Sequence, residues 1–388
     1  MVTDMSVEIL LKESANGFGS DMAKAKPCEL IYEPSDPKYD ESIRRFQGCP
    51  TLAVSRGGRI FIAWYSGGTC EPHMDNYNIL TFSDDGGKTF GKPYIVIPSD
   101  KERCVHALDI QLWTAPNGAL WMFWVQNNTI PEGDKKIKNF CFDEFHPVVN
   151  MNGYCFPDMR HTEWVAVCED PDAEKPVFSE PRLLDIGFLR CKPLVTSTGK
   201  WLFFNYDQLT DRYGYSFSTD NGASFERRYG GLKKVTHFDE GMAYQRLDGS
   251  IRMLARTSLG AIAESISLDD GESWSDGTLT DEASPNTRFY VCRTPSGRIL
   301  LVNNDDKSVR QNMTVYLSED DGKTWKYRKN IDDRRGVSYP DVDFYGEKIY
   351  LTYDRERTGA KEILFLSFTE ADIMDPDVTL TPEIVSKP

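Results

Sequence analysis

A turn containing glycine and followed by an apolar run recurs six times along this chain, and such a repeat constrains the fold more than any single motif. Each copy has the character of two strands joined by a tight turn, because the run after the glycine is rich in Ile, Leu, Val and aromatic residues. A lone hairpin cannot bury such strands, so each copy must pack on its neighbours. The copies span residues 55–68, 115–128, 197–208, 247–258, 295–306 and 345–356.

A second motif, Ser-x-Asp-x-Gly-x-Ser/Thr-aromatic, follows most of the hairpins. Its Ser and Asp side chains can bind the turn's own N–H groups, its Gly takes a positive φ, and its aromatic residue returns to the core. Three copies begin about 50 residues apart, in phase with the hairpins. The clear copies are 83–90, 218–225, 267–274 and 318–325, and degenerate copies begin at Val167 and Ser367.

These repeats predict an all-β chain in which six four-stranded antiparallel sheets follow one another, the architecture of a six-bladed β-propeller. We expect residues 1–388 to form one propeller domain, with an insertion at 127–162 between the second and third strands of blade 2. Residues 7–14 are a candidate strand that closes the ring against blade 6. The expected blades are 48–98, 105–185, 190–232, 238–280, 285–328 and 336–375.

Composition excludes several classes of partner. A net charge of −15 argues against nucleic acids and anionic membranes as partners. No apolar stretch approaches the roughly 20 residues of a membrane span. The first residues lack the pattern of a secretory signal, so we expect a cytoplasmic protein, or a secreted or periplasmic one if a leader has been removed. The sequence leaves the oligomeric state open.

Cysteine and histidine usage gives no sign of a metal or cofactor. The nine cysteines contain no Cys-x-x-Cys, and an odd number without a framework favours free thiols, although Cys141 and Cys155 within the insertion can pair. The five histidines are dispersed, so we expect no catalytic metal. No phosphate-binding Gly-rich loop appears, and we expect no cofactor.

Polar residues gather at one predicted mouth of the ring. In a propeller the starts of the first strands and the ends of the second strands meet there and form a concave site. An ordinary solvent-facing edge would also be polar, but Arg, Glu, Tyr and Asp outnumber the Ser, Thr and Gly expected of plain loops. The positions are Gly48–Pro50, Asp109, Lys192–Pro193, Asp239–Glu240, Arg288 and Tyr339–Asp341 for the first strands, and Tyr65, Gln126–Asn127, Tyr206–Asp207, Arg256, Asn303–Asp305 and Asp354–Arg355 for the second.

The Asp-containing turns and four further stretches resemble the sialidase (neuraminidase) superfamily over nearly the whole chain. In that pattern a Glu begins a blade strand and an Arg ends the next, which implies Glu240 and Arg256 in "DEGMAYQRLDGSIRMLAR" (239–256). A further Arg precedes the last clear Asp-containing turn, which implies Arg310. The stretches 337–354 and 106–113 are similar to those that carry the catalytic Tyr and a substrate-binding Asp, here Tyr339 and Asp109.

The resemblance implies a glycosidase that acts on a terminal acidic sugar. Tyr339 would be the nucleophile and Glu240 its base. The family's acid/base Asp falls in the loop "SGGTCEPHMDNYN" (66–78), where Asp75 is our first candidate, ahead of Glu71 and His73. Asp109 would bind ring substituents, and arginines would bind the sugar carboxylate.

One position departs from the family. Sialidases carry a carboxylate-binding Arg at the start of blade 1, where this chain has Gly48. Arg288 is the first candidate to supply the missing charge, and Lys192 is the second. The expected partner is therefore a glycan or small acidic saccharide. Two alternatives stay open: a related propeller acting on another acidic sugar of uronate type, and a non-catalytic propeller that binds a glycan or a protein.

Overall fold

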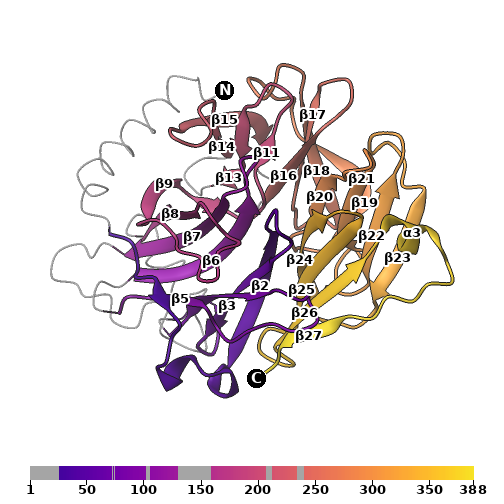
Figure 1. Ribbon diagram of the computed structural model, residues 1–388. Helices are drawn as coiled ribbons and strands as arrows, with labels where there is room; N and C mark the ends of the chain where they lie inside the picture. Colours follow the sequence, from indigo (N-terminus) through magenta and orange to yellow (C-terminus); the bar gives the residue numbers. More distant parts are fainter. Residues whose placement is uncertain are drawn as a thin grey trace.

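The computed structural model of the chain describes residues 26–71, 73, 75–101, 105–129, 159–206, 212–233 and 240–388. Within these residues the strands form six antiparallel blades, which follow one another around the molecule in sequence order (Figure 1). The predicted six-bladed β-propeller is confirmed. In every blade the first strand of the repeat pairs with the second, the second with the third and the third with the fourth, as consecutive hairpins require.

The strand bounds are as follows. Blade 1 holds β2 (Phe46–Val54), β3 (Ile60–Gly67), β4 (Tyr77–Ser83) and β5 (Ile95–Pro98), and blade 2 holds β6 (Val105–Thr114), β7 (Leu120–Thr129), β8 (Met159–Cys168) and β9 (Arg182–Ile186). Blade 3 holds β11 (Leu194–Val195), β12 (Trp201–Phe203), β14 (Arg212–Ser218) and β15 (Glu226–Lys233), beside the short pair β10 (Phe188–Leu189) and β13 (Asn205–Tyr206). Blade 4 holds β16 (Gly241–Gln245), β17 (Ile251–Ala255), β18 (Ala261–Ser267) and β19 (Thr278–Ala283). Blade 5 holds β20 (Tyr290–Arg293), β21 (Ile299–Asn304), β22 (Met313–Ser318) and β23 (Tyr327–Asp332), and blade 6 holds β24 (Val337–Tyr345), β25 (Lys348–Arg355), β26 (Glu362–Phe368) and β27 (Glu383–Ser386).

Blades 1 and 6 differ from the expected outline at their outer edges. Blade 1 gains a fifth strand, β1 (Ile31–Tyr32), which pairs with β5. Two short 3-10 helices, Pro37–Tyr39 and Glu41–Ile43, connect β1 to β2. The boundary expected at residue 375 was wrong, because the helix α3 (Glu370–Met374) and a loop separate β26 from β27, the outermost strand of blade 6. The segment 7–14, predicted to close the ring, lies outside the described residues, as do residues 130–158 of the expected insertion.

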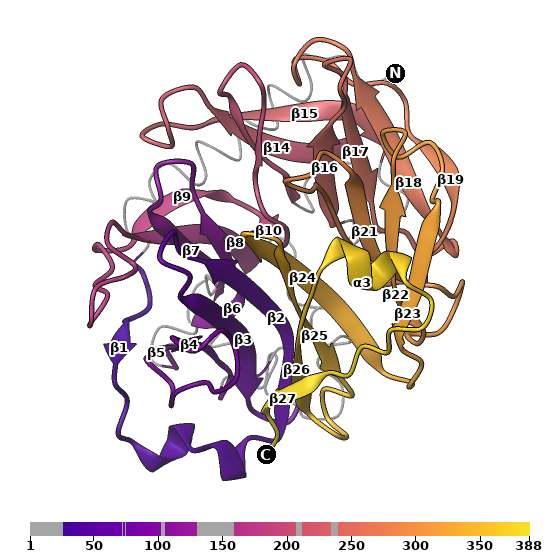
Figure 2. The same ribbon diagram turned by 45° about the vertical axis from the view of Figure 1, so that its right-hand side comes forward.

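The ring closes where blade 1 meets blade 6. In Figure 2 the indigo β2 runs beside β24 and β25. Thr51 Oγ1 in β2 donates a hydrogen bond of 2.6 Å to Asp341 Oδ2 in β24, which joins the first blade to the last. Apolar contacts also join the blades: Trp113 and Trp121 of blade 2 lie edge to face against Trp201 of blade 3, with ring centroids 4.9 and 5.5 Å apart.

The Asp-containing turns have the predicted construction. In blade 5, Ser318 Oγ donates to Asp320 at 2.7 Å and accepts from the Gly322 N–H at 2.8 Å, while Asp320 accepts from the Thr324 N–H at 2.8 Å. The other three clear copies repeat this set of bonds. Gly322 has a φ of +78°. The hydrogen bonds from Thr324 lower the pKa of Asp320 to about 2.

The degenerate copies have acquired other structures. After Ser367, Thr369 caps α3 and exchanges hydrogen bonds with Asp372 in a capping box. In the copy that begins at Val167, Asp172 accepts hydrogen bonds from Ser55 Oγ and the Gly57 N–H, so it links blade 2 to blade 1.

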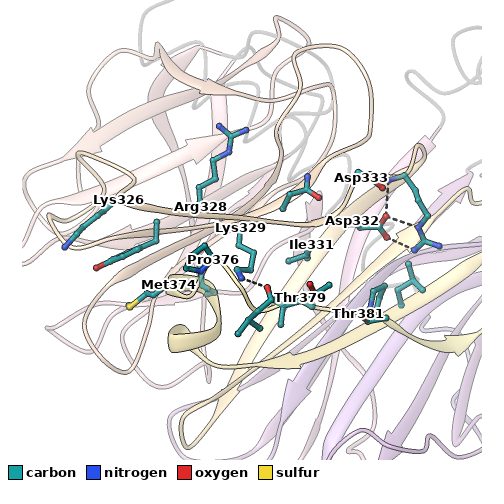
Figure 3. Close-up of a pocket in the computed structure, with 18 of the residues that line it drawn as sticks. Lys326, Arg328, Lys329, Ile331, Asp332, Asp333, Met374, Pro376, Thr379 and Thr381 are labelled. Atoms are coloured by element: carbon teal, nitrogen blue, oxygen red, sulfur yellow. Dashed lines mark hydrogen bonds and ion pairs between the residues drawn. The ribbon is translucent and has the colours of Figure 1, made fainter.

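At the outer edge of blades 5 and 6 an open pocket of about 910 Å³ lies between β23 and the segment after α3 (Figure 3). Lys329 crosses it and donates to the carbonyl oxygens of Asp375 and Val378 at 2.5 and 2.6 Å. None of the candidate site residues lines this pocket. Among the described residues, no helix is long and apolar enough to cross a membrane.

Candidate active site

Three first strands bulge at the same level of the ring. The strand register shifts between Gly48 and Thr51, between Leu108 and Gln111, and between Ser338 and Asp341. Each bulge holds one residue with a positive φ: Cys49 at +54°, Asp109 at +57° and Tyr339 at +56°. A non-glycine residue in this region costs of order 1–3 kcal/mol, and such strain is concentrated at functional sites.

A polar network under the bulges fills the axis of the ring. Gln111 Nε2 donates to Thr51 Oγ1 at 2.7 Å, next to the bond between Thr51 and Asp341. Arg288 is 2% exposed, and its guanidinium donates to Gln111 and to the carbonyl oxygens of Pro50, Tyr339, Pro340 and Arg190 at 2.6–3.3 Å. These bonds place Arg288 beneath Tyr339, where it supports the bulged backbone.

Lys192 also belongs to this axial network. Its ammonium donates to the Val342 carbonyl and lies 3.7 Å from a carboxylate oxygen of both Asp341 and Asp343. The structure therefore places Lys192 on the far side of the bulges from the Tyr339 hydroxyl, among anions of blade 6.

Above the network, Tyr339, Glu240 and Arg256 are in direct contact. The Tyr339 hydroxyl donates to Glu240 Oε1 at 2.9 Å, and Arg256 Nη1 donates to Glu240 Oε2 and to the Tyr339 oxygen, both at 2.9 Å. All three side chains are buried. Glu240 precedes β16 and Arg256 follows β17, and the Arg256 N–H donates to the Glu240 carbonyl at 3.0 Å, so one hairpin of blade 4 supplies both.

The electrostatic environment assigns protonation states to this group. Burial opposes ionisation of Glu240, but Arg256, Arg190 and Arg288 outweigh it and hold its pKa at about 2. Burial raises the pKa of Tyr339, and Arg256 only partly offsets this effect. At neutral pH the pair therefore consists of a phenol that donates and a carboxylate that accepts.

Asp109 and Glu240 share one arginine partner, Arg190. Arg190 Nη1 pairs with Asp109 Oδ1, and Arg190 Nε lies 3.3 Å from Glu240 Oε1. Burial raises the pKa of Asp109 to about 6, against the attraction of Arg190 and with repulsion from Glu71. Arg190 lies in the break between β10 and β11, where the first strand of blade 3 is interrupted at the level of the bulges.

Two more arginines face the Tyr339 ring. The guanidinium carbon of Arg357 is 4.2 Å from the ring centroid and that of Arg310 is 5.5 Å away. Arg310 Nη2 donates to the Asn286 carbonyl at 2.9 Å, and Asn286 also binds Arg256. The structure thus gathers guanidinium groups from blades 3, 4, 5 and 6 around one phenol. We call Tyr339, Glu240, Asp109, Glu71 and these arginines (190, 256, 310 and 357) the basin.

The acid/base candidates are separated by the fold. Glu71 Oε2 accepts from Arg357 Nη1 at 2.7 Å, and an oxygen of Glu71 lies within 4.8 Å of Asp109 and Cys49. Asp75, the first candidate, is half exposed and pairs with Lys101 and with His73, 3.7 Å away. Among the described residues it contacts none of the basin residues, so geometry favours Glu71.

Cys49, Glu71 and Asp109 bring three potential metal ligands together, the one such group in the described part of the chain. Arg357 and Arg190 already neutralise the two carboxylates. Burial raises the pKa of the Cys49 thiol to about 12, which makes loss of its proton costly. The chemistry of this group favours an anion beside the arginines over a cation.

Arg190 and Arg357 are the basin residues that the sequence analysis missed. Arg190 precedes the first strand expected in blade 3 by two residues, and Arg357 lies two residues past the end of β25. The charged run Asp354–Arg357 at a second-strand end was an available signal. The two arginines of this run point in different directions: Arg355 pairs with Glu362 outside the basin, whereas Arg357 lies over the Tyr339 ring.

Comparison with known proteins agrees with this architecture. The BNR repeat-like domain matches residues 58–350, so the chain belongs to this family of repeat propellers. Among curated proteins, no sequence matches the chain.

Solved structures of sialidases are similar in fold. The NanB sialidase from Streptococcus pneumoniae superposes with a TM-score of 0.65 at 16% identity, over 91% of this chain and 73% of that one. The intramolecular trans-sialidase from Ruminococcus gnavus gives 0.65 at 15% identity, over 90% and 98%. The sialidase of Trypanosoma rangeli gives 0.57 at 10% identity, over 86% and 57%. At these identities the likeness concerns the fold.

Proposed function

We propose that this protein is an exo-acting glycoside hydrolase that removes a terminal acidic sugar, a sialic acid or a relative, from glycans. The observation that carries the proposal is the contact among Tyr339, Glu240 and Arg256, the three residues that the resemblance to sialidases implies as nucleophile, base and carboxylate-binding arginine. Sialidases are the glycosidases that use a Tyr nucleophile in place of a carboxylate.

In the first step the Tyr339 oxygen attacks the anomeric carbon and the bond to the leaving oxygen breaks. The phenolic proton passes to Glu240, whose low pKa keeps it ionised and whose Oε1 already accepts that proton's hydrogen bond. A neutral phenol approaches an anionic sugar with less repulsion than a carboxylate would. In the second step water attacks the anomeric carbon and the bond to the Tyr339 oxygen breaks. Glu240 returns its proton to that oxygen, and the group that protonated the leaving oxygen takes the proton of the water.

Arginines of the basin would bind the sugar carboxylate. Arg310 makes its hydrogen bond to a neutral carbonyl and pairs with no carboxylate among the described residues, so its charge remains for a ligand. Each charge-assisted hydrogen bond contributes roughly 1.5–3 kcal/mol. Glu71 is the proposed acid/base group for the leaving oxygen. Its proton must come from solvent when substrate binds, because in the free protein Glu71 accepts a hydrogen bond from Arg357. Asp109, close to Glu71, is proposed to bind ring substituents.

The experiment is a comparison of fluorogenic glycosides. The protein is assayed for release of methylumbelliferone from its sialic acid glycoside and from its glucuronide, with Tyr339→Phe and Glu240→Gln as matched variants. Turnover of the sialoside that both variants abolish supports the proposal. Turnover of the glucuronide alone indicates the uronate-type alternative, which the glycine at position 48 favours. No turnover, with glycan binding unchanged in the variants, would leave a binding propeller.

A further inference from the structure

Position 48 has no room for a side chain. A Cβ built on Gly48 would lie 2.6 Å from Asp354 Oδ2 and 2.7 and 2.8 Å from Cγ and Cδ of Arg357. Real Cβ atoms essentially never approach other atoms so closely, and Gly48 is not one of the glycines with a positive φ. The glycine is therefore needed for space, and the stem of Arg357 occupies that space.

Two carboxylates hold Arg357 in place. Its Nε donates to Asp354 Oδ2 at 2.9 Å and its Nη1 to Glu71 Oε2 at 2.7 Å, and the guanidinium lies over the Tyr339 ring. Asp354 is fully buried and also accepts from the Cys49 N–H at 2.8 Å and from Ser338 Oγ at 2.5 Å. The bulges of blades 1 and 6 thus orient this arginine through Asp354.

One edge of the Arg357 guanidinium is unpaired. Nη2 is buried and has no hydrogen-bond acceptor among the described residues. Leaving such a donor without a partner costs about 1–3 kcal/mol, and more for a charged group. A rigidly held, buried donor with no acceptor indicates that a ligand atom belongs there.

The local balance of charge points to an anionic ligand. Burial lowers the pKa of Arg310, and the nearby positive charges of Arg357 and Arg256 lower it further. A carboxylate placed between Arg310 and Nη2 of Arg357 would satisfy the unpaired donor and relieve this repulsion.

We propose that Arg357, reaching in from the end of blade 6 through the space left by Gly48, is the third carboxylate-binding arginine of the basin beside Arg256 and Arg310. The identity of the ligand as a sugar acid rests on the proposed function. The physical claim is narrower: a carboxylate binds against Nη2 of Arg357, and the arginine's point of entry has moved from the first blade to the last.

The test measures binding of matched acids and esters to the full chain by calorimetry. The probes are the dehydrated sialic acid analogue, its methyl ester, and free glucuronate. For Arg357→Ala we expect the affinity for the acids to fall roughly 10- to 100-fold while the weak affinity for the ester stays unchanged. Arg355→Ala, two residues away and paired with Glu362, is the control and should bind like the unaltered chain.

Moving the arginine from position 357 to position 48 tests whether Arg357 contacts the ligand or only supports the structure. Arg357→Gly combined with Gly48→Arg should recover part of the lost affinity once the Asp354 carboxylate, whose Oδ2 lies 2.6 Å from the built Cβ, shifts to pair with the new guanidinium. Gly48→Arg alone should lose both affinity and thermal stability, because two side chains then compete for one space. Arg357→Lys keeps the positive charge beside Asp354 and Glu71 but lacks the planar guanidinium that donates two parallel hydrogen bonds to a carboxylate. This variant should bind acids at least about 10-fold more weakly and retain its melting temperature.

The outcomes separate this inference from the proposed function. If the sialic acid analogue fails to bind but glucuronate binds in an Arg357-dependent way, the sialidase proposal fails and the inference stands. If the analogue binds and Arg357→Ala binds acid and ester like the unaltered chain, the inference is overturned and the sialidase proposal stands. If none of the acids binds to the unaltered chain, the inference is overturned as well.

Discussion

Tyr339 and Glu240 lie 99 positions apart in the chain, yet the phenol donates a hydrogen bond of 2.9 Å to the carboxylate. The contact depends on two local devices. Tyr339 sits in a bulge with a positive φ, and Glu240 immediately precedes the first strand of blade 4. Arg256 then binds both partners, so the pair is held from a third direction.

The first prediction concerns this pair. Tyr339→Phe removes the attacking oxygen and Glu240→Gln removes the acceptor of its proton, so each should lower kcat/KM roughly 10²- to 10⁴-fold. With a substrate whose electron-withdrawing fluorine slows the second step, mass spectrometry should find the sugar attached to Tyr339. A label on any other residue, or turnover that survives Tyr339→Phe, would remove Tyr339 from its proposed role.

The second prediction distinguishes Glu71 from Asp75. A proton donor matters most when the leaving group is a poor one. Glu71→Gln should therefore slow hydrolysis of a sialylated saccharide, whose leaving group is a sugar hydroxyl, roughly 10²- to 10⁴-fold, and should slow release of methylumbelliferone much less. Asp75→Asn, on the half-exposed pair with Lys101, should change neither rate appreciably. The reverse order of effects would restore Asp75 as the acid.

The third prediction concerns a buried acid outside the basin. Glu163 on β8 is fully buried, and burial together with the Asp185 carboxylate raises its pKa well above the ordinary 4.5, an effect that Asn205 and Arg227 only partly offset. The folded state therefore binds this proton more tightly than the unfolded state. Its stabilising effect is complete below about pH 4.5 and is lost as pH rises toward the folded-state pKa.

Glu163→Gln should accordingly raise the free energy of unfolding at pH 8 by about 1–3 kcal/mol and have much less effect at pH 4.5. Urea titrations at both pH values measure the difference. Glu169→Gln, an exposed site just after the same strand, serves as the control and should be neutral at both. A Glu163→Gln chain that is less stable at pH 8 would indicate that the ionised carboxylate is stabilised.

The fourth prediction concerns the Asp-containing turns. Ser318→Ala removes the acceptor for the buried Gly322 N–H and a donor to Asp320, and should cost about 1–3 kcal/mol of unfolding free energy. Ser308→Ala, on an exposed loop of the same blade, should cost far less. Equal melting temperatures for the two variants would show that the turn motif contributes little to stability.

The architecture was accessible from the sequence because it depends on local, repeated signals. A Gly turn with alternating apolar residues specifies a hairpin wherever it occurs, and six copies specify six blades. The Ser–Asp–Gly turns are equally local, since all their bonds lie within eight residues. Where a copy had degenerated, as in the one that begins at Ser367, the prediction weakened: blade 6 was expected to end at residue 375, but its fourth strand, β27, follows at Glu383–Ser386.

The basin was only partly accessible. Glu240, Arg256, Arg310 and Tyr339 were named by a resemblance, and the fold brings them together. Arg288 was expected to replace the missing blade-1 arginine but binds backbone carbonyls beneath Tyr339. Nothing in the order of residues distinguishes an arginine that supports a strand from one that faces a ligand, because the direction of a side chain depends on bulges and on neighbouring blades.

The sequence by itself determined the number of blades, their strand order and the chemical type of the residues at one mouth, because hairpin turns and apolar alternation are encoded within a few residues of one another. The tertiary structure decided which of those residues share a site. Gly48 and Arg357 illustrate the difference. Gly48 belongs to the first blade and Arg357 to the last, and only closure of the ring brings the side chain of Arg357 into the space that Gly48 leaves open.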